Sequence, residues 1–150
     1  YLGQVAERVQ ALRSDVPVWL QESGMVESKR QWFIDQFEPE GRGVGFAVLG
    51  GAFAEGIDLP GSRLIGAFVA TLGLPPVDPV QEATRRRIEA QWRGRGYDYA
   101  CLVPGVRKVV QAAGRVIRGE GDEGVLYLID DRFAAVQAKG LLPGWWATHT

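Results

Sequence analysis

Apolar residues along the chain follow two patterns, one with helical spacing and one of short continuous runs. Helical spacing predicts helices over residues 2–13, 28–37, 78–92 and 104–118. Short apolar runs predict strands over residues 17–20, 46–49, 65–72 and 125–129. Strands that are apolar throughout and alternate with helices favour a parallel sheet that is covered on both faces. The sequence therefore predicts an α/β fold, whose ligands would bind at the carboxyl ends of the strands.

Polar residues and glycines mark the ends of these predicted elements. Ser28 is suited to cap the helix that follows it. A glycine-rich turn is expected before the second strand, at Gly41, Gly43 and Gly45. Residues 94–103 show neither pattern, and we expect irregular structure there.

The predicted helix over residues 104–118 has two chemically different faces. At about 100° per residue, its polar side chains fall within one arc, and none of them is acidic. These side chains are Arg107, Lys108, Gln111, Arg115 and Arg118. One interpretation is the solvated face of an amphipathic helix. The other is a phosphate-binding face, because arginine matches phosphate oxygens and Gly114, which costs about 1 kcal/mol inside a helix, would permit a close approach.

Two segments carry a resemblance to a known family. Residues 111–118, Gln-Ala-Ala-Gly-Arg-Val-Ile-Arg, resemble the Q-x-x-G-R-x-x-R motif VI of helicases of the second superfamily. Residues 54–61, Ala-Glu-Gly-Ile-Asp-Leu-Pro-Gly, resemble their motif V in the form typical of the XPD/DinG type. The order of motif V, strand, Pro-Pro turn, helix, motif VI and closing strand also matches. Over nearly its whole length, the chain resembles the second motor domain of such a DNA helicase.

The resemblance implies a RecA-like three-layer sandwich with a mainly parallel sheet and helices on both faces. Residues 1–150 would form a single domain of a longer helicase, without the whole first motor domain. The domain's first strand is also expected to be absent. A vacant position in the sheet would favour association with another chain, including self-association of the fragment.

The resemblance also implies roles in ATP hydrolysis. In this family ATP lies between two RecA-like domains, and the second domain supplies arginine fingers. Arg115 and Arg118 would reach the γ-phosphate, and Gln111 would position the nucleotide or the attacking water. The residues expected to bind the nucleotide or couple its site to the nucleic acid are Glu55, Gly56, Asp58 and Gly114. For residues 55–58 an ordinary strand-to-helix loop is the alternative interpretation.

Contacts with single-stranded DNA are expected at strand ends and on the arginine-rich helix. The candidates are Gln21, Ser23, Arg63, Arg85 and Arg86. A solvated helix face is the alternative for the arginines of residues 85–95. Three nearby aromatic residues could stack on bases or simply pack, namely Trp92, Tyr97 and Tyr99.

Composition limits the chemistry that this chain can perform alone. The net charge is −1, so the chain as a whole is not a basic nucleic-acid binder. None of its three lysines lies in a G-x-x-x-x-G-K-[ST] loop. We therefore expect ATP with Mg²⁺ to be bound mainly by the missing first domain, and the fragment alone to be inactive.

Cysteine and acidic residues give no sign of a metal site. The single cysteine, Cys101, excludes a disulfide or a cysteine-ligated cluster built from this chain. An iron–sulfur cluster, which relatives often carry, would belong to the missing half. Asp130 and Asp131 follow the last strand and are interpreted as a helix cap. No membrane-spanning run or signal peptide is visible, so we expect a cytoplasmic protein with no membrane contact.

Two hypotheses about function follow. The first is the second motor domain of an ATP-dependent DNA helicase, in which ATP hydrolysis drives translocation on single-stranded DNA and unwinding, with DNA repair as the expected setting. The alternative is a non-catalytic RecA-like module that binds nucleic acid or a protein partner. A nucleotide-binding α/β domain of another type is disfavoured, because no glycine-rich loop lies between a strand and a helix.

Overall fold

The structure is a computed structural model that describes residues 1–51, 53, 58–117 and 121–147. Its helices are α1 (Leu2–Leu12), α2 (Glu27–Asp35), α4 (Pro79–Gln91), α5 (Val103–Ala113) and α6 (Val136–Lys139). Its strands are β1 (Val18–Leu20), β2 (Val44–Phe46), β3 (Gly66–Val69) and β4 (Val125–Leu128). Short 3₁₀ turns cover Gly61–Arg63 and Asp131–Ala134, and a π-helical turn, Asp98–Leu102, leads into α5. The alternation of helices and strands is the predicted one.

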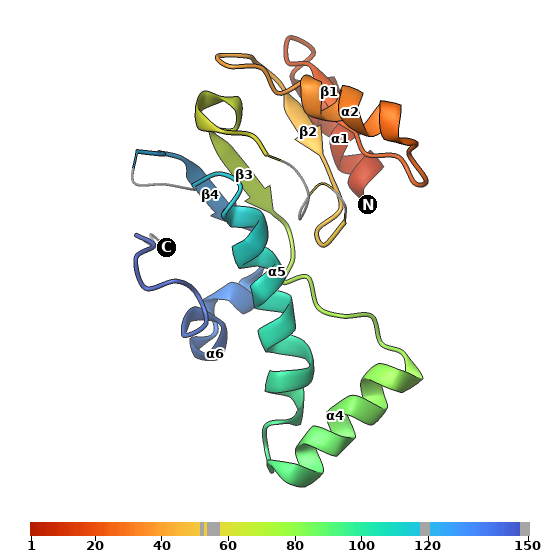
Figure 1. Ribbon diagram of the computed structural model, residues 1–150, viewed down its shortest axis with the longest axis vertical. Helices are drawn as coiled ribbons and strands as arrows, with labels where there is room; N and C mark the ends of the chain where they lie inside the picture. Colours follow the sequence, from red (N-terminus) through yellow and green to blue (C-terminus); the bar gives the residue numbers. More distant parts are fainter. Residues whose placement is uncertain (52, 54–57, 118–120, 148–150) are drawn as a thin grey trace.

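The strands form two parallel pairs. β1 pairs with β2, with Trp19 opposite Gly45, and β3 pairs with β4, with Phe68 opposite Tyr127. In Figure 1, β2, β3 and β4 point in the same direction. These pairs confirm the predicted α/β class with parallel strands.

An aromatic core lies between α2 and the β1–β2 pair. The ring of Phe33, only 1% exposed, packs against Phe53 with their centroids 4.3 Å apart. Trp19 meets Phe37 edge to face at 5.0 Å. A Cβ on Gly45 would lie 2.6 Å from the Phe37 ring, so these rings require a glycine there. The predicted glycine turn is therefore wrong at Gly45, which lies inside β2, and the strand lies two residues earlier than expected.

A second core lies between α5 and the β3–β4 pair. Val106 and Val109 of α5 are almost fully buried and pack with Val69 and Leu72. A Cβ on Gly105 would lie 2.7 Å from the carbonyl oxygen of Leu72. Glycine thus allows the start of α5 to lie directly against the chain that leaves β3. This packing fixes the position of the helix that carries the predicted phosphate-binding face.

The other face of the β3–β4 pair is exposed to solvent. Phe68 and Tyr127 stack at 4.7 Å with nearly parallel rings, and both side chains are more than half exposed. Exposed apolar side chains extend this face along β4 at Val125 and Ile129. The expectation of strands buried on both faces is therefore not met for this pair, because α5 packs on one side and the alternate side chains point away from it.

Several predicted helix ends need correction. α2 begins at Glu27 with Val26 as its N-cap, so Ser28 lies inside the first turn and is not the cap. α5 ends at Ala113 with Gly114 as its C-cap, several residues before the predicted end. The stretch expected to be irregular contains the π-helical turn Asp98–Leu102, which joins α5 without a break.

α4 projects from the body of the molecule as an arm (Figure 1). It begins at Pro79, its N-cap Asp78 accepts a hydrogen bond from the Gln81 N–H, and it ends at Gln91, as the sequence predicted within one residue. It contacts the π-helical turn Asp98–Leu102. Within the described residues, no helix is long and apolar enough to cross a membrane.

Candidate functional site

The cationic face of α5 is confirmed as far as Gln111. Arg107 and Gln111 are exposed and Lys108 is half-buried, while Val106, Val109 and Ala113 are buried on the opposite side. Within the part of the chain that the structure describes, no carboxylate pairs with Arg107 or Lys108. The face is thus positively charged and available to an anion.

The end of this face differs from the prediction. Arg115 lies in the turn after α5 and is half-buried, with its backbone N–H bonded to the Ala112 carbonyl at 3.1 Å. Gly114 caps the helix with φ −63° and is not a mid-helix residue as predicted. A Cβ there would lie 3.4 Å from the Val110 carbonyl oxygen, which is ordinary contact. No described residue of this chain therefore requires glycine at this position. Arg118 lies outside the described residues.

The loop after β2 lies between α5 and β1. Gly50 has φ +77°, a conformation that favours glycine, and a Cβ there would lie 3.3 Å from Cδ of Lys108. On the other side, Oε1 of Gln21 accepts a hydrogen bond from the Val48 N–H at 2.8 Å. The loop that leads into motif V is thus held between a side chain of the motif VI helix and one at the end of β1.

Motif V is anchored by buried apolar residues. Phe53 before it and Leu59 within it are 3% and 2% exposed and join the aromatic core. Asp58, next to Leu59, is exposed at the surface. The predicted coupling residues Glu55 and Gly56 lie outside the described residues.

A hollow of about 390 Å³ opens at the carboxyl ends of β1 and β2. Its wall brings together the two predicted DNA contacts Gln21 and Ser23 and adds Arg30, which the sequence reasoning missed. Val48 and Phe53 supply apolar wall. Arg30 could have been noticed, because it lies in the second turn of the helix that follows a strand end, where ligands of parallel sheets bind.

Arg63 has a structural contact away from this hollow. Its Nε donates to the Phe37 carbonyl at 2.6 Å, and its Nη2 lies 3.4 Å from the Ile34 carbonyl. A cation at the carboxyl end of a helix interacts favourably with the last carbonyl groups, which carry the negative end of the helix dipole. A contact between Arg63 and nucleic acid stays a prediction.

Arg85 and Arg86 both bind Glu82 on α4. Their guanidinium groups lie 2.8 and 2.9 Å from the same carboxylate oxygen. These two hydrogen bonds, Arg85 first, lower the pKa of Glu82 to about 2. The pair is thus partly neutralised, and its role as a DNA contact also stays a prediction.

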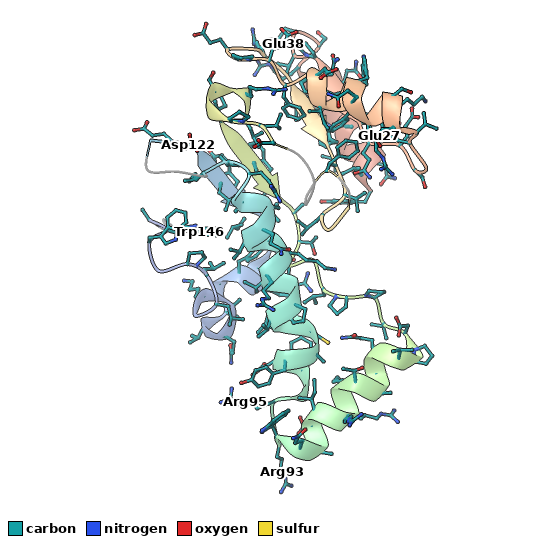
Figure 2. All side chains as sticks on the ribbon, in the orientation of Figure 1. Glu27, Glu38, Arg93, Arg95, Asp122 and Trp146 are labelled. Atoms are coloured by element: carbon teal, nitrogen blue, oxygen red, sulfur yellow. The ribbon has the colours of Figure 1, made fainter. Side chains whose placement is uncertain are left out.

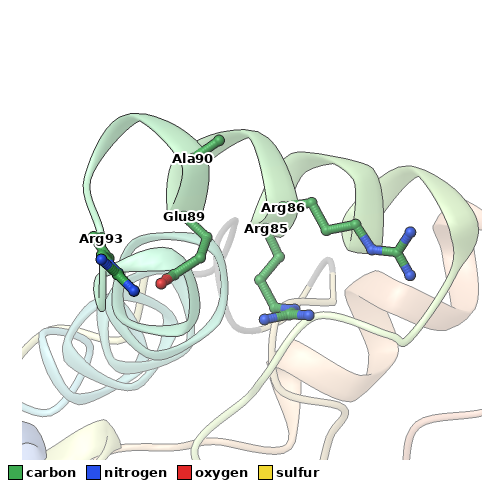
Figure 3. Close-up of a pocket in the computed structure, with 5 residues that line it drawn as sticks. All are labelled: Arg85, Arg86, Glu89, Ala90 and Arg93. Carbon is green, nitrogen blue, oxygen red and sulfur yellow. The ribbon is translucent and has the colours of Figure 1, made fainter.

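A shallow hollow of about 410 Å³ lies beside these arginines (Figure 3). Glu89 borders it and accepts hydrogen bonds from the backbone N–H groups of Gly94 and Gly96 at 2.7 and 2.8 Å, which lower the pKa of Glu89. Figure 2 shows Arg93 and Arg95 at the far end of this arm, well away from Glu27 on α2. The structure therefore does not bring the arginine helix together with the Gln21–Ser23 hollow.

The acidic residues after β4 form a cap, as predicted. Asp130 accepts a hydrogen bond from the Arg132 N–H at 3.0 Å and pairs with the Arg132 guanidinium, which lowers the pKa of Asp130 to about 2. Among the described residues, no cluster of His, Cys, Asp or Glu could hold a metal ion. Cys101 is a half-buried free thiol.

Comparison with known proteins identifies the family that this arrangement represents. The model of the helicase C-terminal domain family matches residues 1–149. The chain belongs to the helicase C-terminal domain family. Relatives of this domain include a probable ATP-dependent helicase of Methanocaldococcus jannaschii, 33% identical over 75% of the chain, and the XPD helicase subunit of transcription and DNA repair factor IIH of Arabidopsis thaliana, 33% identical over 73%. The mouse regulator of telomere elongation helicase 1 is 34% identical over 71%.

The solved structure of an XPD helicase confirms the RecA-like α/β fold. It superimposes on 92% of the helicase C-terminal domain with a TM-score of 0.68, at 20% sequence identity. Together with the family match, these relatives make the chain the C-terminal domain of an XPD/DinG-type helicase. The matched segment spans only 18%, 14% and 10% of the length of the three relatives.

Proposed function

We propose that this domain is the second motor domain of an ATP-dependent DNA helicase. In the full-length protein it would supply Arg115 and Arg118 as arginine fingers, with Gln111 positioning the nucleotide or attacking water. ATP and Mg²⁺ would be held mainly by the first RecA-like domain. Hydrolysis would drive translocation on single-stranded DNA and unwinding.

The observation that carries this proposal is the cationic face of α5, a helix that contains no acidic side chain. Arg107 and Lys108 have no acidic partner among the described residues, and Arg115 follows at the end of the same helix. In phosphoryl transfer, positive groups fixed in advance stabilise the charge that spreads over the phosphate oxygens. A helix face that only contacts water can carry both acidic and basic side chains, whereas the side chains of this face carry only positive charge.

The loop after β2 offers a route for coupling. Its Gly50 lies beside Lys108 of α5, and its Val48 N–H is hydrogen-bonded to Gln21 at the end of β1. Motif V, with Glu55, Gly56 and Asp58, continues from this loop. A change at the nucleotide would thereby move the carboxyl ends of β1 and β2, where we place part of the DNA track.

The remaining partners come from the relatives. One relative is named as a DNA repair factor subunit and another as a telomere helicase, which supports a DNA substrate and a setting in DNA repair. Arg63, Arg85 and Arg86 would add backbone contacts. An iron–sulfur cluster, where one exists, would lie in the other half of the protein, in keeping with the single cysteine here.

ATP hydrolysis by the full-length protein and by residues 1–150 alone tests the proposal. We expect the full-length protein to hydrolyse ATP faster with single-stranded DNA and to unwind a duplex with a single-stranded tail. We expect no hydrolysis by residues 1–150. DNA binding without hydrolysis by the full-length protein would contradict the motor function and support the non-catalytic RecA-like module.

A further inference from the structure

We propose that the hollow at the carboxyl ends of β1 and β2 binds one phosphodiester group of single-stranded nucleic acid, with Arg30 as its main ligand. This inference rests on the proposed function and deepens it by naming the chemical group and the residue. It also changes the role of Gln21, which we had expected to contact DNA. Gln21 instead positions the loop beside the hollow through its hydrogen bond with the Val48 N–H.

Arg30 is suited to exchange its present partner for a phosphate. Its guanidinium lies 3.6 Å from the Glu27 carboxylate, beyond the 2.7–2.9 Å or so of a charge-assisted hydrogen bond. The Glu27 side chain is 85% exposed, so water already competes for it. Arg30 is 44% exposed and lines the hollow with a planar fork of donors that fits two phosphate oxygens.

The other acidic group near the hollow is already neutralised. The Glu22 carboxylate binds Lys29 at 2.8 Å and therefore repels an incoming phosphate less than a free carboxylate would. The exposed hydroxyl of Ser23 has no partner among the described residues and can donate one hydrogen bond. Arg30 and Ser23 both line the hollow and together provide its donors.

The apolar part of the lining suits the rest of a nucleotide. Oε1 of Gln21 is occupied by the Val48 N–H, which fixes the loop so that the half-exposed Val48 borders the hollow. Phe53 also borders the hollow, although its side chain is only 3% exposed. A volume of about 390 Å³ is near the lower end of the range for small-molecule sites, about 300–1,000 Å³. The hollow thus accommodates one nucleotide unit, with its phosphate at Arg30.

Salt-dependent binding of an oligo-dT strand to the full-length protein tests this assignment. We expect Arg30→Gln to bind about tenfold more weakly, the effect of losing one charged hydrogen-bonding pair. The slope of log K against log salt should become shallower by about 0.7, the value for one phosphate contact on a single strand. Arg30→Lys should retain the slope and lose only part of the affinity, because lysine keeps the charge without the fork.

Arg42→Gln is the matched control. Arg42 also makes an exposed ion pair, with Asp15 at 2.7 Å, but it precedes β2 and lies at the amino end of the strands. Asp15 keeps Arg13 at 2.9 Å, so the control should fold and bind DNA like the wild type. Thermal unfolding of each variant would detect any loss of structure.

The possible results distinguish failure of the phosphate site from failure of the proposed motor function. If the wild type binds DNA and Arg30→Gln keeps its affinity and salt slope, the phosphate site is refuted while the motor function stands. If Arg42→Gln weakens binding as much as Arg30→Gln, the effect is general charge and the site is also refuted. A wild type that binds no single strand would contradict both proposals.

Discussion

Gly105 within α5 and Gly114 at its C-cap differ in the space that they leave for a side chain. At Gly105 a Cβ would meet the fixed carbonyl of Leu72 at 2.7 Å. We expect Gly105→Ala to lower the free energy of unfolding by about 1–3 kcal/mol, as overpacking against backbone usually does. Urea unfolding monitored by circular dichroism measures this. An unchanged midpoint would show that α5 does not lie so close to the end of β3.

Gly114 gives the opposite expectation for stability. Its φ of −63° and contacts of 3.4 Å or more would accept alanine. We expect Gly114→Ala to leave the free energy of unfolding unchanged or raise it by up to about 1 kcal/mol. If the glycine serves approach of the first motor domain, ATP hydrolysis by the full-length variant should nevertheless fall. Full hydrolysis at normal stability would remove that role.

The Glu82 cluster predicts a pH dependence of stability. Arg85 and Arg86 hold the pKa of Glu82 at about 2, below its usual 4.5. A carboxyl whose pKa is lower in the folded state stabilises the fold above its unfolded pKa, and this contribution is lost as the pH falls through the folded pKa. We therefore expect Glu82→Gln to lower Tm at pH 7 and to lower it much less near pH 2. An equal Tm difference at both pH values would contradict the ion pairs.

Some local residue roles were predictable, although Ser28 is not the cap that we expected, and distant contacts were not predictable. Asp78 caps α4 and Asp130 caps the 3₁₀ turn after β4. The sequence indicates both caps because each lies directly before the element that it caps. The partners of Gln21 and Arg63 lie 27 and 26 residues away in sequence, so only the fold reveals them. Arg30 was missed for a similar reason, since the hollow forms only when two strand ends meet.

At the scale of elements, the spacing of apolar residues predicted which helices and strands exist better than it predicted where they begin and end. α1 and α4 end within one residue of the prediction because their apolar periods and caps are local. β2 was misplaced because Trp19 and Phe37, remote in sequence, select glycine within the strand. α5 ends early at Gly114, where periodicity alone continued the helix to Arg118.

The face that α2 presents to the core can be tested with adjacent aromatic residues. Phe33 is 1% exposed and contacts three other aromatic rings, whereas Trp32 is half exposed. We expect Phe33→Ala to lower the free energy of unfolding by about 3–5 kcal/mol. Trp32→Ala should cost clearly less in the same denaturant titration. Equal losses would mean that α2 is rotated about its axis.

At the scale of the whole molecule, the alternation of helices and strands predicted the α/β fold class. It did not predict which faces of the strand pairs are covered by helices. Apolar runs between helices correctly indicated parallel strands in an α/β fold, and the resemblance to helicases indicated the RecA-like type. They did not show that Phe68 and Tyr127 would stack on an exposed face, because apolar strands look alike whether one or both sides are covered. The motif pair indicated the family, and the match of the helicase C-terminal domain model to residues 1–149 confirmed it.

We propose that two motor domains divide the work of ATP hydrolysis. The motif VI arginines of this domain act on ATP that is bound mainly by the other domain. Removing a finger should then affect the chemical step more than DNA binding, because the charge that the finger stabilises exists only in the transition state.

Steady-state ATP hydrolysis by the full-length protein, with saturating single-stranded DNA, tests this claim most directly. We expect Arg115→Ala and Arg118→Ala each to lower kcat by about 10³-fold or more while DNA affinity stays near that of the wild type. Arg42→Ala should hydrolyse ATP normally. Retention of wild-type kcat in either finger variant would contradict the role assigned to that arginine.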